Sequence, residues 1–117
     1  MEKEKWLVRI NNNWYENVHI VEGTRKEATD FVENAVKKMV IQRQKDVEED
    51  GAIYKGNGPE DTRTIHNVSN GVDFIKAECF IGYEGELDEQ EAYVEARAIK
   101  LDTVPVVTFD EIMKSLD

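Results

Sequence analysis

The segment from Thr24 to Gly51 constrains the fold most, because its apolar residues recur with the period of an α-helix. Thr24 and Glu27 have the spacing of a capping box, in which each side chain bonds the backbone amide of the other residue. Gly51 suits the left-handed backbone that often follows a helix. We therefore predict a helix over residues 25–49, with one apolar stripe formed by Ala28, Phe31, Val32, Ala35, Val36, Met39 and Val40.

Segments on both sides of this helix alternate apolar and polar residues, which is the period of a β-strand. Residues 5–22 predict a hairpin, because the three asparagines at 11–13 tolerate the left-handed backbone of a tight turn. The stretches "VDFIKAECFIGYEG" (72–85) and "AYVEARAIKL" (92–101) predict a second, longer hairpin. Its tip is "EGELDEQE", residues 84–91.

The rest of the chain is a glycine-rich stretch and a short C-terminal segment. Residues 51–71 contain four glycines and many polar residues, which predicts a long loop in which "TIHNV" is compatible with a short strand. Thr108 and Glu111 repeat the capping-box spacing, and the apolar residues that follow predict a short helix over 109–116. Pro105 interrupts the strand before it.

The predicted elements follow the order ββαββα. They fit one α+β domain over residues 1–117, a two-layer sandwich in which a four-stranded antiparallel sheet carries the long helix on one face. The second helix is short. We expect the following side chains to be largely buried: Leu7, Val8, Ile10, Phe31, Val32, Val36, Met39, Ile75, Ile81, Val94 and Ile99.

The net charge of -10 is unevenly distributed and limits the classes of partner. Residues 46–61 carry six acids against one base, and residues 71–99 carry eight acids against two bases. Such surfaces repel nucleic acids and anionic membranes and attract basic proteins. The apolar runs are too short to span a membrane, and the "MEKEKW" start does not resemble a secretory signal, so we expect a cytoplasmic protein.

Catalytic and metal-binding patterns are weak in this sequence. His19 and His66 lie far apart without helix-spaced ligands, and the single cysteine, Cys79, lies in an apolar strand where a buried thiol is expected. "GNG" at 56–58 lacks the lysine and hydroxyl residue of a phosphate-binding loop. We expect a protein that is not an enzyme and has no cofactor or metal. A separate hypothesis is an enzyme, such as a hydrolase with a metal held by carboxylates, whose activity would depend on His66 or Asp61.

The acidic hairpin tip is the main candidate for partner binding. It has five carboxylates in eight positions, and we assign partner binding to Glu78, Glu84, Glu86, Asp88, Glu89, Glu91 and Glu95. A regular row of negative charge on a strand attracts a basic groove. The alternative is a solvated tip whose charge prevents aggregation at a sheet edge. Trp14 and Tyr15, next to the hairpin turn, form a secondary candidate surface.

In size, fold class and acidic patches, rather than in any motif, the chain resembles small acidic inhibitor proteins of phages and mobile elements, including the anti-CRISPR class. That resemblance implies a stoichiometric inhibitor or DNA mimic that occupies the basic groove of a nucleic-acid-binding effector. The alternative function is a self-associating accessory or assembly protein of a phage or mobile element. It would associate through a sheet edge or the Trp14 and Tyr15 turn.

Overall fold

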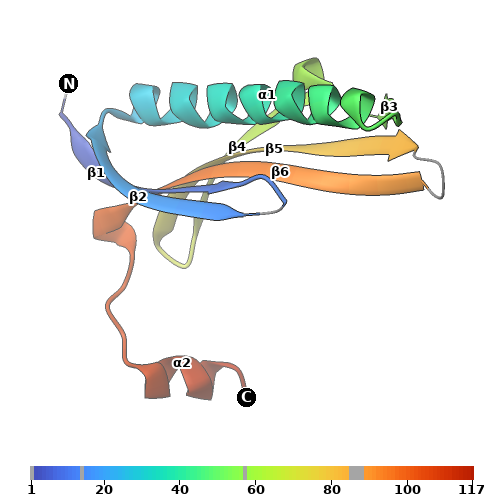
Figure 1. Ribbon diagram of the computed structural model, residues 1–117. Helices are drawn as coiled ribbons and strands as arrows, with labels where there is room; N and C mark the ends of the chain where they lie inside the picture. The colour runs from blue at the N-terminus through green and yellow to red at the C-terminus, as the bar shows by residue number, and fades with distance from the viewer. Residues whose placement is uncertain (1, 14, 57, 85–88) are drawn as a thin grey trace.

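The computed structural model describes residues 2–13, 15–56, 58–84 and 89–117 (Figure 1). The predicted partner-binding residues Trp14, Glu86 and Asp88 lie outside the described residues, as do the side chains of Glu89 and Glu91. The elements in chain order are β1 (Glu4–Asn11), β2 (Glu16–Gly23), α1 (Arg25–Glu49), β3 (Ile53–Gly56), the 3-10 turn η1 (Pro59–Asp61), β4 (Arg63–Ser69), β5 (Val72–Glu84), β6 (Glu89–Lys100), the 3-10 turn η2 (Leu101–Thr103) and α2 (Phe109–Ser115).

One antiparallel sheet contains six strands, so the prediction of four strands in a ββαββα order is corrected. The strands follow the order β2-β1-β6-β5, and the outer edge of β5 pairs with β3 near one end and with β4 near the other. Both added strands lie within residues 51–71, which were predicted as a loop, and β4 contains "TIHNV", the stretch that was compatible with a short strand. Because β5 has 13 residues, its edge is long enough to pair with two short strands in succession.

The helix α1 has the predicted limits, and both of its ends are closed by hydrogen bonds. At the start, Thr24 and Glu27 form the complete capping box. At the end, Gly51 has a φ of 81°, and the amides of Gly51 and Ala52 donate to the carbonyls of Glu48 and Val47. This Schellman arrangement satisfies carbonyls that would otherwise lack a partner, so the acidic last turn is held by the backbone.

The core lies between α1 and one face of the sheet, which we call the helix face. Trp6 and Val8 from β1 meet the alternate residues of β5 and β6, and α1 contributes Val32, Val36 and Val40. The predicted burial is confirmed for Val8, Val32, Val36, Ile75, Ile81 and Val94. It is incomplete for Leu7, Ile10, Met39 and Ile99.

Phe31 corrects the prediction of burial, since it is 40% exposed. The helix packs mainly on β5 and β6 and touches β1 less, so the side of its apolar stripe nearest to β1 and β2 is left partly uncovered. Figure 1 shows α1 lying along one side of the sheet and α2 on the opposite side, separated from the sheet by a linker.

Candidate functional site

The fold brings two acidic segments together that are distant in the sequence. The last turn of α1 leads through residues 51 and 52 into β3, and Ile53 in β3 pairs with Glu84 at the end of β5. The end of α1 and the end of β5 therefore lie at the same end of the molecule (Figure 1). We call the set Asp46, Glu48, Glu49, Asp50 and Glu84 the acidic end.

The backbone strengthens the negative potential of the acidic end. The last turn of α1 contains no basic residue. The partial negative charge at a helix C-terminus adds to that of its side chains. Glu48, Glu49 and Asp50 are exposed, whereas Glu84 forms an ion pair with Lys55, with an Nζ to Oε2 distance of 2.8 Å. A basic partner would therefore meet three solvated carboxylates on the helix before it meets a paired one on the hairpin.

Glu78 and Glu95, which were predicted to belong to the same surface, lie elsewhere in the structure. They face each other across β5 and β6 on the sheet face opposite α1, which we call the open face. The Tyr93 hydroxyl lies 2.5 Å from Glu78 Oε2 and 2.6 Å from Glu95 Oε2. Glu95 is only 8% exposed. Their negative charges are thus directed into an internal network.

Three bases complete this network on the open face. Lys76 Nζ lies 3.3 Å from Glu78, and Arg97 Nε lies 3.2 Å from Glu95. The latter contact is an ion pair rather than a well-aligned hydrogen bond, since neither of its two atoms has a hydrogen-bond partner of acceptable geometry. Arg9 lies 2.5 Å from Glu16 and 3.9 Å from Glu95. Carboxylates that are already paired in this way contribute little to long-range attraction.

The network also changes the acidity of its members. The hydrogen bond from Tyr93 lowers the pKa of Glu78 below its usual value, against the opposing effect of burial, and Lys76 lowers it further. Burial raises the pKa of Tyr93 strongly, and the hydrogen bonds to the two carboxylates raise it further. The tyrosine is therefore a neutral donor at every physiological pH.

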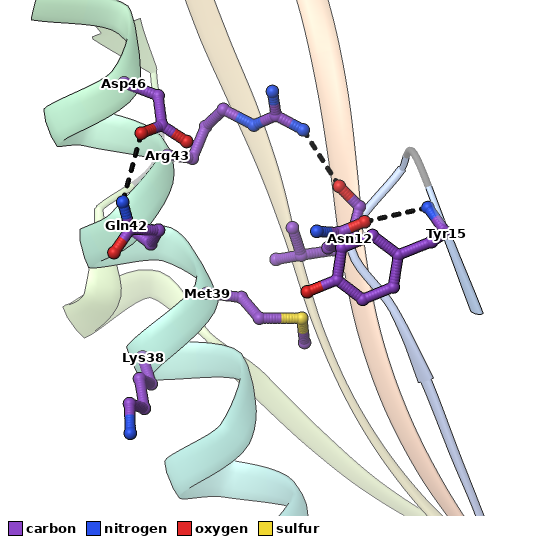
Figure 2. Close-up of a pocket in the computed structure, with 8 residues that line it drawn as sticks. Asn12, Tyr15, Lys38, Met39, Gln42, Arg43 and Asp46 are labelled. Carbon is purple, nitrogen blue, oxygen red and sulfur yellow. Dashed lines mark hydrogen bonds between the residues drawn. The ribbon is translucent and has the colours of Figure 1, made fainter. Parts of the chain in front are cut away.

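A groove lies between α1 and the turn that joins β1 to β2, and we call it the hairpin groove (Figure 2). It consists of two adjoining hollows of about 240 Å³ and 480 Å³ that share Tyr15, Lys38 and Met39. The smaller hollow extends to Asp46, where the acidic end begins. Phe31 lines the larger, more apolar hollow. The groove is therefore mainly apolar in its larger hollow, and its smaller hollow, which reaches the acidic end, is lined mostly by polar side chains, Lys38 and Arg43 among them.

Tyr15, a predicted secondary binding residue, lies at the junction of the two hollows. Its side chain is 56% exposed and projects toward Met39 in Figure 2. The Tyr15 amide donates to Asn12 Oδ1 at 3.0 Å, and Asn13 takes the left-handed conformation with a φ of 82°. These local bonds, which depend on the asparagine-rich turn, hold the ring in place over the groove.

Arg43 anchors the floor of the groove to the turn. This side chain of α1 is buried, and its Nη2 donates to the Asn12 carbonyl at 2.8 Å. Sequence reasoning missed Arg43, Met39 and Phe31 as groove residues, because their spacing placed two of them in the apolar stripe.

His66 and Asp61, the two residues named in the hydrolase hypothesis, belong to different elements, β4 and η1. His66 Nε2 lies 2.7 Å from Asp73 Oδ1 and 2.7 Å from Arg25 Nη1, and Arg25 forms an ion pair with Asp73 near the start of α1. Asp61 belongs to η1, in another part of the chain. Burial opposes ionisation of Asp73, but the bonds from Arg25 and His66 prevail and lower its pKa. Cys79 is buried, as expected.

Over residues 2–13, 15–56, 58–84 and 89–117, no group of three or more His, Cys, Asp or Glu side chains is arranged to hold a metal ion. Within the same residues, no helix has the length and apolar character needed to cross a membrane.

Comparison of the chain with protein-family models, with curated proteins and with solved structures gave no match. The geometry of the acidic end and of the hairpin groove is therefore the basis for any functional assignment.

Proposed function

We propose that this chain is a non-enzymatic protein-binding domain that recognises a basic segment of a partner protein. The supporting observation is the continuity of the hairpin groove with the acidic end at Asp46. An apolar side chain of the partner would enter the groove beside Tyr15 and Met39. Basic side chains that follow it would face the carboxylates of the last turn of α1.

Electrostatics favours a basic partner over other macromolecules. The exposed carboxylates at the acidic end repel the phosphates of a nucleic acid or an anionic membrane, and they steer a positively charged surface toward the groove. The groove supplies what charge alone lacks, because partly exposed apolar and aromatic residues contribute most of the affinity at protein interfaces. The charges speed the association and orient the partner, and Tyr15 anchors the partner in the groove.

The partner class proposed from the sequence, a nucleic-acid-binding effector, agrees with this chemistry. A groove that binds DNA or RNA is lined with lysine and arginine, and a row of carboxylates competes with phosphates for it. The supporting surface consists of the acidic end and the groove. Glu78 and Glu95 are not part of it, because both are engaged with Tyr93 on the open face.

A capture experiment with matched variants tests the proposal. The tagged protein is used to capture partners from a bacterial lysate, at low and high salt and with or without duplex DNA, and bound proteins are identified by mass spectrometry. The acidic-end variant carries Glu48→Lys and Glu49→Lys. The control variant carries Glu2→Lys and Glu22→Lys, which changes the charge equally at exposed positions distant from the groove.

The expected result is a basic protein that binds the wild type and the control, and that binds the acidic-end variant and Tyr15→Ala at least about tenfold more weakly by calorimetry. Competition by duplex DNA would identify the bound surface as a nucleic-acid groove. Equal affinity for the acidic-end and control variants would refute the role of the acidic end. Equal affinity for wild type and Tyr15→Ala would refute the role of the groove.

A further inference from the structure

The C-terminal arm, residues 104–117, carries an apolar surface that nothing in the described part of the chain covers. Phe109, Met113 and Leu116 are 88%, 63% and 74% exposed, although they form one stripe of α2. A helix of seven residues is too short to be stable in water by itself. Thr108 Oγ1 nevertheless accepts a hydrogen bond from the Glu111 amide, so the start of α2 is capped. A helix with these properties requires a docking surface.

The open face offers a complementary surface, organised in rows that cross the sheet. Cross-strand pairing places Ile20 beside Leu7, Leu7 beside Ile99, and Ile99 beside Phe74. This apolar row spans β2, β1, β6 and β5 at the end of the sheet where β6 leads into the arm. Ile20 is 62% exposed. The apolar row has about the width that one short helix needs to bury its stripe.

Charge on the two surfaces is also complementary. The next row of the open face places the bases Arg9, Arg97 and Lys76 side by side on neighbouring strands. Each of these bases already forms an ion pair with a carboxylate of the same face, Arg9 with Glu16, Lys76 with Glu78 and Arg97 with Glu95, so only the side of the row that faces the apolar row lacks acids. In α2, Asp110 and Glu111 lie in the first turn and Lys114 in the last. A helix laid on the apolar row can therefore direct its acids toward the basic row.

The start of the C-terminal arm determines whether α2 can reach the open face of its own sheet or only that of a second copy. Thr103 Oγ1 accepts from the Asp73 amide at 3.0 Å and donates to the Lys100 carbonyl at 2.6 Å, which fixes the direction in which the chain leaves the sheet. Val104 and Thr108 are both extended, with ψ angles of 120° and 162°, and Pro105 stiffens the linker between them. The arm projects away from its own sheet (Figure 1).

We infer that α2 docks on the open face of a second copy of this chain, across the row formed by Ile20, Leu7, Ile99 and Phe74. An arm that is held away from its own sheet reaches a neighbouring molecule without bending the linker. Because each copy has one arm and one open face, a two-fold axis lets both arms dock at once, as an isologous dimer requires. A stable dimer buries about 1,600 Å² in total, and two arms with two partly apolar faces supply a surface of that kind.

Light scattering over a range of protein concentrations tests the dimer with two variants that alter opposite sides of the contact. The arm variant carries Phe109→Ser and Leu116→Ser, and its control is Val106→Ser, a fully exposed linker residue. The face variant carries Ile20→Ser. Its control is Val68→Ser, an exposed residue of β4 whose side chain points to the other side of the sheet. Circular dichroism and urea titration confirm that each variant folds.

The expected result is a wild-type dimer whose dissociation constant rises at least tenfold in the arm variant and in the face variant and stays unchanged in both controls. Mixing the arm variant with the face variant should restore association, because one intact arm then meets one intact face. A wild type that remains monomeric at every concentration would overturn the inference. So would a dimer that neither variant weakens, or a mixture that fails to associate.

This inference is independent of the proposed partner. The acidic-end variant with Glu48→Lys and Glu49→Lys alters the other side of the molecule and should dimerise like the wild type. Loss of partner capture with an unchanged dimer supports both conclusions separately. A monomeric wild type that still captures a basic protein overturns only the dimer.

Discussion

Removing the Tyr93 hydroxyl with Tyr93→Phe should reveal how strongly the open-face network depends on one proton. The hydroxyl lies 2.5 Å from Glu78 and 2.6 Å from Glu95, but it has a single proton and donates to one carboxylate at a time. A hydrogen bond to a charged acceptor contributes about 1.5–3 kcal/mol to the free energy of unfolding. In the variant, two carboxylates face each other across β5 and β6 without a donor between them.

We expect the free energy of unfolding at pH 7 to fall by about 1.5–3 kcal/mol. In a domain of this size, that loss lowers the Tm by roughly 6–12 °C. The assay is urea denaturation followed by circular dichroism, with the Tm from thermal scans as a second readout. The matched control is Tyr15→Phe, because Tyr15 is exposed and lies outside the network.

The same variant should show a pH dependence of defined sign. Tyr93 lowers the pKa of Glu78 in the folded state below the unfolded value of about 4.3. The stabilisation that this shift represents is complete above about pH 5 and is lost as the pH falls through the folded pKa. The difference between wild type and Tyr93→Phe should therefore narrow on acidification. Equal stabilities at pH 7, or a difference that does not narrow as the pH is lowered below the unfolded pKa of about 4.3, would refute the reasoning.

Three further substitutions test the fold. Phe31→Ala should lower the free energy of unfolding by only about 1–2 kcal/mol, compared with about 3–5 kcal/mol for a buried phenylalanine. The loss is small because the ring is partly exposed in an open groove, so its removal leaves no closed cavity. A loss of about 3–5 kcal/mol in urea titration would contradict this. Gly82→Ala should lower the free energy of unfolding by on the order of 1–3 kcal/mol, since a Cβ there would lie 2.6 Å from the Lys55 carbonyl oxygen. The amides of β3 should then exchange faster with solvent. Unchanged exchange would argue against the close approach. Thr24→Ala should cost about 1 kcal/mol in the Tm-derived stability through loss of the α1 cap, and Thr24→Ser should restore most of it.

The two short strands show why part of the sheet was hard to predict: β3 was missed, and β4 was anticipated only as a possible short strand at "TIHNV". β3 has four residues and β4 has seven exposed ones, so neither displays the alternation that a buried face imposes. Each strand forms because the long edge of β5 supplies its hydrogen-bond partners. Such a partner is defined only after β5 and β6 have paired. A glycine-rich sequence without a hydrophobic face therefore looks like a loop until its neighbour is in place.

The candidate binding surfaces could be predicted only in part from the sequence, for a similar reason. The acidic composition of the hairpin tip and of the end of α1 was evident, but the position of Glu84 near the end of α1 depends on β3, which joins the helix to the edge of β5. Glu78 and Glu95 looked equivalent to the tip residues by charge alone. Their alternation on β5 and β6 directs them to the open face, where Tyr93 and three bases surround them.

The sequence by itself determined the limits of α1, the two long hairpins, the capped start of α2 and most of the core. These features arise from local rules, in which the spacing of apolar residues and the chemistry of Thr24, Asn13 and Gly51 act within a few positions. Tertiary structure alone decided the six-stranded sheet, the exposure of Phe31 in a groove, the separation of Glu78 and Glu95 from the acidic end, and the uncovered α2. Each of these depends on contacts between residues that are far apart in the chain. The apolar periodicity of one segment does not specify which other segment it packs against.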